Sequence, residues 1–328
     1  MSNKKLAVIM DPIQDINPHK DSSLAMLLEA QKRGYEIYCG DLADIWLDGA
    51  MPRGRLTKLK VFDDTAHWFE IVETVEFDLG ELDVILMRKD PPFDIQYVFS
   101  TYVLEQAERH GTLIVNHPQG LRDANEKAFV AWFPDCVPAT LITRSLDEMS
   151  KFIAIHERVV VKPLDLMGGR SVFSTDIEDG NHNVIFETVS DYGRKYTVLQ
   201  QYIPEIVESG DRRILLIDGE PIPFALARIP VPGDHRGNMD AGARIEVHPL
   251  TDREWSICKR IGPLLREKGL LFTGIDIIGD YMTELNVTSP TGIRELERES
   301  GLSIVEKLFD SISSHCQSIQ QASERSVL

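Results

Sequence analysis

The chain has 328 residues, of which 43% are hydrophobic and 27% are charged, the balance of an ordinary globular protein. Its net charge of −17 argues against a general nucleic-acid binder, because such proteins neutralise phosphates with an excess of lysine and arginine. The sequence contains no apolar run of membrane-spanning length, no signal peptide, and four scattered cysteines without a disulfide or zinc pattern. We therefore expect a cytoplasmic protein with reduced thiols and two or three structural units.

The first 120 residues predict strands that alternate with helices. Strands are expected at 5–10, 35–39, 82–87 and 112–115, helices at 21–34 and 95–110, and edge strands or a hairpin within 46–77. This cadence indicates a mostly parallel sheet with helices on its faces. Ligands bind beyond the strand ends of such sheets. The polar residues at these places are Asp11, Asn17, Lys20, Asp21 and Ser22 after the first strand, and Arg88 and Lys89 after strand 82–87.

The second half of the chain predicts more strands and a long loop. Asn116-His117-Pro118 suggests a domain boundary near residue 120. Helices are expected at 122–133, 146–156, 252–268 and 303–317, and strands at 139–143, 158–162, 172–174, 196–202, 211–217, 220–229, 272–278 and 281–287. Prolines at 221 and 223 suggest that strand 220–229 lies at a sheet edge. The long, glycine-bearing loop from Pro230 is of the kind that is usually a functional lid or a disordered segment.

Oxygen donors stand within the last two strands, where apolar residues are expected. Glu284 and Asn286 are two residues apart and so share one face of their strand. Asp276 joins that face only if the connection is irregular, and we expect the irregularity at residues 279–281. Three converging oxygen donors form the kind of site that holds Mg²⁺ against phosphates, although charged residues also occur on edge strands.

A glycine turn follows the strand that ends at Lys162. In Leu164–Ser171, Gly168 and Gly169 allow backbone N–H groups to converge on phosphate oxygens, and the lysine adds a positive charge. The loop is not a Walker loop, because GxxxxGK[ST] is absent. By itself such a turn is more often a plain turn.

Two further groups of residues suit a nucleotide site. Gln200–Pro204 ends a strand and offers backbone hydrogen bonds and an apolar wall for an adenine ring, although an ordinary strand end has the same composition. Arg213, Arg228 and Arg236 lie on neighbouring segments around the long loop, and guanidinium groups bind phosphoryl and carboxylate oxygens.

Taken in this order, the motifs resemble those of the ATP-grasp ligases, and most closely the bacterial glutathione synthetase family. The resemblance spans nearly the whole chain and rests on KDSSLAMLLEAQKRGYE, DVILMRKDPPFD, KPLDLMGG and TELNVTSPTGIRE. It implies an α/β chain, α+β overall, with a preATP-grasp domain at 1–120. A two-part ATP-grasp domain would follow at 121–328, with a lid subdomain at about 125–203 and a catalytic subdomain at about 204–328.

The resemblance also implies the reaction: ATP, γ-glutamylcysteine and glycine give glutathione, ADP and phosphate through an acyl phosphate. It assigns Asp276, Glu284 and Asn286 to two Mg²⁺ ions, which Mn²⁺ can replace. It places ATP on Lys127, Lys162, Gly168, Gly169, Gln201, Ile203 and Asp211. It makes Arg88, Arg213, Arg228 and Arg236 catalytic.

For the substrate carboxylates we expect Lys20, Ser22, Arg88 and Arg294, the last for glycine. The family further implies a homotetramer and small-molecule partners, without nucleic acid or membrane. One departure concerns the lid, where Gly242-Ala243-Arg244 replaces the expected pair of glycines before an arginine.

Two alternatives stay open at this point. The chain could be another ATP-grasp carboxylate–amine ligase, such as a dipeptide ligase, with the same donors and a different substrate. It could also be a synapsin-like ATP-binding regulatory protein, although a pure binder does not need the donor trio and the arginines together.

Overall fold

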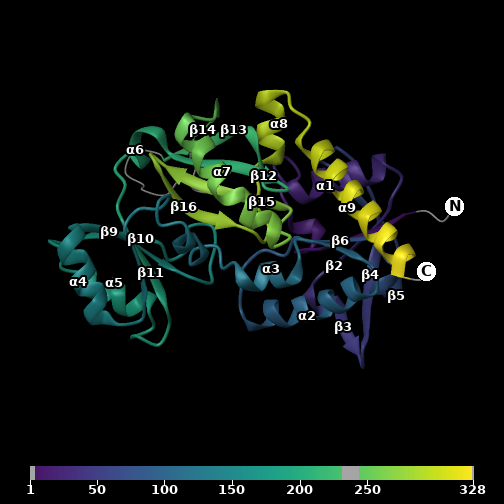
Figure 1. The fold of residues 1–328 in the computed structure, drawn as a ribbon, viewed down its shortest axis with the longest axis horizontal. Helices are drawn as coiled ribbons and strands as arrows, with labels where there is room; N and C mark the ends of the chain where they lie inside the picture. Colours follow the sequence, from purple (N-terminus) through teal and green to yellow (C-terminus); the bar gives the residue numbers. More distant parts are fainter. Residues whose placement is uncertain (1–3, 231–243, 327–328) are drawn as a thin grey trace.

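A computed structural model describes residues 4–230 and 244–326. Within these residues the strands form three sheets, of seven, four and five strands. The four-stranded sheet and its two helices project from one side of a larger body that contains the other two sheets (Figure 1). The described residues contain no helix that is both long and apolar enough to span a membrane.

The seven-stranded sheet contains a parallel part and an antiparallel part. The parallel part has the order β2-β1-β6-β7, from Glu36–Gly40, Lys5–Ile9, Val84–Met87 and Leu113–Val115. The antiparallel part contains β3 (Ile45–Asp48), β4 (Met51–Val61) and β5 (Phe69–Asp78), with β4 paired to β2. The α/β prediction is confirmed, and the expected edge region at 46–77 forms this antiparallel extension.

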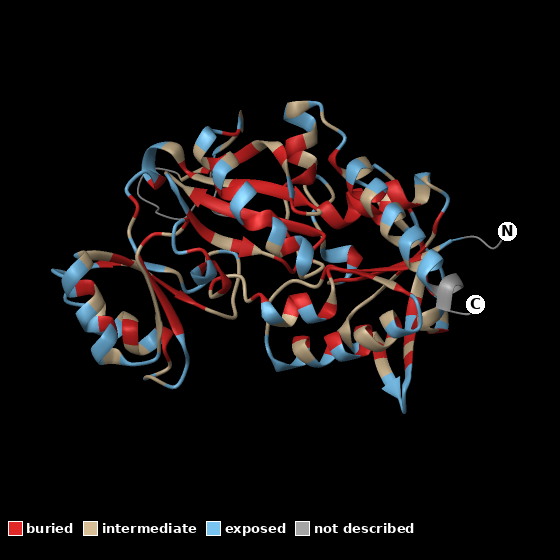
Figure 2. Cartoon of the chain, in the orientation of Figure 1, coloured by how far each residue is buried: buried red, intermediate tan, exposed pale blue. Residues whose placement is uncertain are grey.

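Helices cover both faces of this sheet and bury its apolar strands. They are α1 (Ser22–Lys32), α2 (Ile95–Arg109), α3 (Pro118–Asp123) and α9 (Ile304–Ser326). Asp21 caps α1 by accepting a hydrogen bond from the Leu24 N–H, and Asp94 caps α2 in the same way through Gln96 and Tyr97. The buried residues concentrate along the strands, whereas the outer faces of the helices are exposed (Figure 2).

The four-stranded sheet is antiparallel and has the order β10-β9-β11-β8. Its strands are β8 (Thr140–Thr143), β9 (Arg158–Pro163), β10 (Phe173–Asp176) and β11 (Thr197–Gln201), and its helices are α4 (Leu146–His156) and α5 (His182–Val189). A separate small core, including Met149, Val161 and Phe186, holds the two helices on the sheet. The glycine loop connects β9 to β10, as the sequence predicted.

The five-stranded sheet is antiparallel and has the order β14-β13-β12-β15-β16. Its strands are β12 (Asp211–Ile217), β13 (Glu220–Ile229), β14 (Arg244–Pro249), β15 (Phe272–Ile278) and β16 (Tyr281–Asn286). The helices α6 (Ile206–Ser209), α7 (Asp252–Glu267) and α8 (Ile293–Ser300) accompany it.

The prediction that strand 220–229 is an edge strand is wrong, because β14 pairs with it. The pairing runs from Phe224 opposite Pro249 to Ile229 opposite Arg244. Pro221 and Pro223 precede this paired stretch, so their missing N–H groups interrupt no ladder with β14. The prolines therefore mark the end of an inner strand that pairs only with β12.

The prediction of a helix at 122–133 is also wrong. The chain forms α3, leaves the helix, and makes a short 3₁₀ turn at Phe129–Trp132. Asn125 interrupts the helix because its side-chain oxygen accepts hydrogen bonds from the N–H groups of Lys127 and Ala128. The break sets Glu126 and Lys127 in a turn that contacts β16 through the Leu285 N–H.

The expected irregularity between β15 and β16 exists, but at another place. The connection at Gly279-Asp280 is a regular two-residue turn, with Ile278 opposite Tyr281. The register then shifts, so that Ile277 faces Met282 while Asp276 faces Glu284. Thr283 is therefore the extra residue of a β-bulge, and a bulge moves all following side chains to the other face.

Candidate active site

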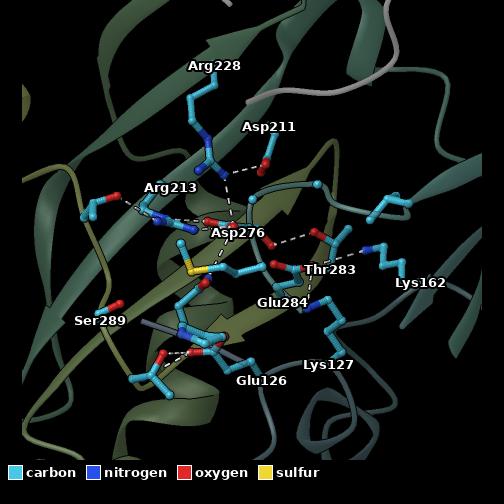
Figure 3. Close-up of a pocket in the computed structure, with 18 of the residues that line it drawn as sticks. Glu126, Lys127, Lys162, Asp211, Arg213, Arg228, Asp276, Thr283, Glu284 and Ser289 are labelled. Carbon is cyan, nitrogen blue, oxygen red and sulfur yellow. Dashed lines mark hydrogen bonds and ion pairs between the residues drawn. The ribbon is translucent and has the colours of Figure 1, made fainter. Parts of the chain in front are cut away.

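The three sheets meet at a cavity of about 620 Å³. Most of the predicted site residues line it: Lys20, Lys127, Lys162, Gly168, Gly169, Gln201, Ile203, Asp211, Arg213, Arg228, Asp276, Glu284 and Asn286. They come from segments that are far apart in the sequence, and Figure 3 shows how the charged side chains converge. Thirteen residues that the sequence singled out therefore lie on the wall of one cavity.

The predicted oxygen donors lie on a common face of the β15–β16 hairpin. Asp276 is directly opposite Glu284, and Asn286 is two residues further along β16. The Asn286 side-chain amide donates a hydrogen bond of 3.3 Å to the Asp276 carboxylate. The bulge at Thr283 produces this alignment, which confirms the shared face.

Two arginines converge on Asp276. Arg213 donates hydrogen bonds of 2.8 and 2.7 Å to its two carboxylate oxygens, and an Nη of Arg228 lies 3.0 Å from one of them. Arg228 also donates a hydrogen bond of 2.5 Å to Asp211 (Figure 3). These contacts join Arg213, Arg228, Asp211 and Asp276 into one ion network at the back of the cavity, and all four side chains are mostly buried.

The pKa values follow from this network. Burial alone would raise the pKa of Asp276, but the guanidinium groups of Arg213 and Arg228 outweigh it and hold that pKa below its usual range. Burial and the neighbouring carboxylates raise the pKa of Asp211, against the effect of Arg228. The network therefore fixes Asp276 as a carboxylate.

Two lysines point into the same space from the opposite wall. Lys127 donates a hydrogen bond of 2.5 Å to the Leu166 carbonyl, and Lys162 donates one of 2.8 Å to the Gln200 side chain. Their Nζ atoms lie 3.8 and 3.9 Å from Glu284. Burial lowers the pKa of Lys162, which Glu284 opposes. Polyphosphate oxygens could reach both ammonium groups.

The two glycines of the loop after β9 have a backbone conformation that other residues rarely adopt. Gly168 has φ +66° and Gly169 has φ +70°, so both occupy the left-handed region that favours glycine. Both residues line the cavity next to Met167. The loop thus brings its backbone close to the two lysines without a side chain in between.

The remaining wall of the β9–β11 side is apolar. It consists of side chains at the strand ends and just beyond them: Val160, Met167, Val172, Ile203 and Ile206. Gln201 and Tyr202 lie at its margin, and Arg158 stacks on the Tyr202 ring at 3.8 Å. A flat aromatic ring fits an apolar wall of this kind with polar groups at its rim.

Some predicted residues do not line the cavity. Arg88 is buried behind it and donates hydrogen bonds to the Ser23 hydroxyl and the Pro290 carbonyl, and its Nη1 has no partner in the described chain. Ser22 is buried and accepts a hydrogen bond from the Ile293 N–H. Arg294 binds the Pro18 carbonyl and an exposed aspartate.

Arg236 and the Gly242-Ala243 departure lie outside the described residues. The substrate and catalytic roles expected for Arg88, Ser22, Arg294 and Arg236 therefore stay predictions.

The N-terminal wall contains a group of polar residues that the sequence identified only in part. This wall contains Asp11, Asp15, Asp21, Asp90 and Glu126, together with hydroxyl groups from the loop after β16: Thr288, Ser289 and Thr291. Asp11 and Asp21 were expected near a ligand because they follow the first strand, and Asp90, which follows the end of β6, carried the same signal but was missed. The hydroxyl residues carried no such signal, because a Thr-Ser-Pro-Thr segment resembles an ordinary loop.

The donor set fits a hard divalent cation. Among the described residues, no group of three or more His, Cys, Asp or Glu side chains is arranged around a metal position. Asp276, Glu284 and Asn286 supply two carboxylates and one amide oxygen instead, all from one face of the hairpin. Oxygen donors of this kind are those that Mg²⁺ uses, with water and phosphate oxygens in its other positions.

Comparison with protein-family models identifies the chain. Residues 5–122 match the model of the prokaryotic glutathione synthetase N-terminal domain, and residues 126–301 match that of the ATP-grasp domain of the same family. The chain belongs to the prokaryotic glutathione synthetase family. It is an ATP-dependent ligase, and the recognition of the ATP-grasp motifs is confirmed.

Full-length relatives agree with this family. The chain is 51% identical to the glutathione synthetase of Escherichia coli K12 over 313 residues, which cover 95% of this chain and 99% of the relative. It is 50% identical to the glutathione synthetase of Shewanella oneidensis, over 94% of this chain and 98% of the relative. D-alanyl-alanine synthetase A from Vibrio cholerae shares the fold, with a TM-score of 0.61 and 13% identity over 96% of this chain and 99% of that one.

Proposed function

We propose that the protein joins γ-glutamylcysteine to glycine, with ATP hydrolysed to ADP and phosphate, and so makes glutathione. The observation that carries the proposal is the convergence of Lys127, Lys162, Arg213 and Arg228 around Asp276 and Glu284 in one cavity. Such an arrangement suits the transfer of a phosphoryl group to a carboxylate, because charge spreads over the phosphoryl oxygens during the step. The substrate is supported by the relatives, which are glutathione synthetases along nearly their whole length.

We assign the apolar wall to the adenine ring, with Gln201 and Ile203 at its edge. The phosphates then extend towards Lys127, Lys162 and the Gly168-Gly169 loop. Asp211 suits the ribose, because its buried Oδ1 has no hydrogen-bond partner in the described chain and can accept from a hydroxyl group. These assignments place ATP along one side of the cavity.

Asp276, Glu284 and Asn286 would hold the Mg²⁺ ions, for which Mn²⁺ can substitute. A bound cation supplies positive charge to the phosphate oxygens and orients them. Two Mg²⁺ ions are the number that the family resemblance implies. The guanidinium groups of Arg213 and Arg228 lie beside these donors, and so the protein itself also contributes positive charge at the reacting phosphate.

The chain's own residues suit the acyl phosphate route. Transfer of the γ-phosphoryl group to the cysteinyl carboxylate of γ-glutamylcysteine makes that carbon electrophilic, and the glycine amine then displaces phosphate. We place Arg228 beside the oxyanion of the second step, because its guanidinium lines the cavity and its Nε has no partner in the described chain. Exclusion of water, which would hydrolyse the acyl phosphate, we assign to the lid with Arg236.

The substrate carboxylates are proposed to lie near the N-terminal wall. Lys20 lines the cavity there. Behind it, Arg88 holds the loop after β16 through the Pro290 carbonyl, and Ser22 holds Ile293 at the start of α8. We propose that Ser22, Arg88 and Arg294 act on the substrate from this second layer. Glycine would lie nearest to Arg294.

We further propose the division at residue 120, with subdomains at 125–203 and 204–328, because each part has a sheet of its own. We also propose that the protein is a homotetramer, that it is located in the cytoplasm, and that its partners are small molecules. The four cysteines are free, which suits a reducing compartment.

The deciding experiment measures ADP release and the peptide product with different acceptors. We expect turnover with γ-glutamylcysteine and glycine, and none with D-alanine in place of both. Turnover with D-alanine alone would favour a dipeptide ligase. ATP binding without turnover in either mixture would favour a regulatory ATP-binding protein and refute the ligase proposal.

A further inference from the structure

The loop after β16 is held by side chains from elsewhere in the chain. It spans residues 287–292, between β16 and α8. Asp90 accepts a hydrogen bond from the Ser289 hydroxyl, Arg88 donates one to the Pro290 carbonyl, and Arg213 donates a longer one, of 3.4 Å, to the Thr291 hydroxyl. Thr288, Ser289 and Thr291 line the cavity, and so these contacts fix part of its wall.

Glu126 makes the largest number of these contacts. One oxygen of its carboxylate accepts hydrogen bonds from the Val287 N–H at 2.9 Å, from the Thr288 N–H at 3.0 Å and from the Thr288 hydroxyl at 2.8 Å. The Glu126 backbone carbonyl also accepts a hydrogen bond of 2.9 Å from the Leu285 N–H. Figure 3 shows the carboxylate beside this loop, below Glu284 and Lys127.

A second side chain holds Val287 from the other direction. Asn116 donates hydrogen bonds of 2.7 Å to the Val287 and Phe272 carbonyls and accepts one of 2.8 Å from the Phe272 N–H. It is buried and does not line the cavity, so it ties together the ends of β15 and β16 in the core. Glu126, in contrast, faces the cavity and binds the residues that lead into the hydroxyl-rich loop.

Glu126 connects the segment of Lys127 with the segment that carries the oxygen donors of β16. Lys127 follows it directly, and Leu285, whose N–H it accepts, lies between Glu284 and Asn286. A single residue therefore fixes the lysine segment, the last donors of β16 and the start of the loop relative to one another. Small displacements of reacting groups reduce rates strongly, whereas binding of distant ligand parts is unaffected.

We propose that Glu126 is a positioning residue for the ligase reaction, which aligns Lys127 and the loop 287–291 with the oxygen donors of β16. This inference rests on the proposed ligase function. The carboxylate does not touch the reacting atoms in this role. It acts through the backbone of Val287 and Thr288.

The test compares Glu126→Ala and Glu126→Gln with a matched pair at Asp94. Asp94 also accepts hydrogen bonds from two backbone N–H groups, at the start of α2, and does not line the cavity. Glu126→Ala should lower kcat at least twentyfold and raise the KM for ATP by a much smaller factor, because the adenine wall is untouched although Lys127 at the phosphates is displaced. Glu126→Gln keeps an acceptor oxygen and should retain at least one fifth of kcat. Asp94→Ala and Asp94→Asn should leave both constants within twofold.

A second measurement tests the contact between Glu126 and the loop without depending on turnover. Hydrogen–deuterium exchange of peptides that contain residues 285–291 should be at least tenfold faster in Glu126→Ala than in the parent protein, and unchanged in the Asp94 variants. If the parent protein makes no glutathione, the proposed function fails while the exchange result still decides whether Glu126 holds the loop.

Three results would overturn the inference. The first is full kcat in Glu126→Ala. The second is a loss of kcat in Glu126→Gln as large as in Glu126→Ala while the loop amides stay protected, since the charge and not the position would then matter. The third is unchanged exchange at Val287 and Thr288 in either variant that has lost kcat. If Glu126→Ala does not fold, Glu126→Gln alone decides: a kcat below one fifth of that of the parent protein, with the loop amides still protected, would overturn the inference.

Discussion

Arg213 donates hydrogen bonds of 2.8 and 2.7 Å to the two carboxylate oxygens of Asp276, from the neighbouring strand of the same sheet. The Asp276 side chain is only 5% exposed, whereas that of Glu284, directly across the hairpin, is 23% exposed. The two carboxylates both face the proposed cation site, but they differ in their exposure and in their other partners. Asp276 neutralises buried guanidinium groups, and Glu284 is more open to ligands.

This difference predicts unequal effects of two matched substitutions. Asp276→Asn should lower the free energy of unfolding by about 3 kcal/mol, because it leaves Arg213 buried without its carboxylate and leaves Arg228 with Asp211 alone. Glu284→Gln should lower it by less than about 1 kcal/mol, because its nearest cations are 3.8 and 3.9 Å away and it is partly exposed. Both should abolish turnover. Urea unfolding gives the comparison, and equal losses would contradict it.

The same ion network predicts a dependence of stability on pH. A carboxylate whose pKa is lower in the folded protein stabilises the fold above its unfolded pKa of about 4, and this contribution disappears as the pH falls through the folded pKa. The Asp276 pKa is lowered in this sense. The stability difference between the parent protein and Asp276→Asn should therefore shrink as the pH falls below about 4. Urea titrations at each pH test this, and a difference that grows in acid would refute it.

Removal of divalent cations should stop turnover but leave the fold intact. Asp276 already has Arg213 and Arg228 as partners, so the site does not depend on a cation for its charge balance. With a chelator, ADP release should fall to background while the thermal midpoint changes by less than about 2 °C. Added Mg²⁺ should restore turnover. A large fall of the midpoint would show that the cation is also structural.

The glycine loop predicts a selective loss of nucleotide affinity. Gly168→Ala and Gly169→Ala place a Cβ on a left-handed residue, which costs about 1–2 kcal/mol. The free loop can relax, so the cost should appear as an approximately tenfold weaker binding of ATP. Gly180→Ala is the matched control, since its φ is not left-handed and an added Cβ meets open space. Nucleotide titrations should separate the three variants, and equal affinities would show that the loop backbone does not contact the phosphates.

Local patterns in the sequence determined much of this site. The spacing of two between Glu284 and Asn286 placed them on one face, because side chains alternate along a strand. The Gly168-Gly169 pair indicated a tight turn between two strands, which is also a local property of the chain. The alternation of strands and helices likewise predicted the α/β core before any long-range contact was known.

The tertiary structure decided the contacts between distant segments. Arg213 and Asp276 are separated by 63 positions in the sequence, and Glu126 and Thr288 by 162. No periodicity reports such pairs, because they arise when buried polar groups find partners during packing. The bulge at Thr283, the burial of Arg88 and the coverage of β13 by β14 have the same origin. Sequence therefore determined which groups stand on each strand, and packing determined which of them are bound by the protein itself and which face the ligand.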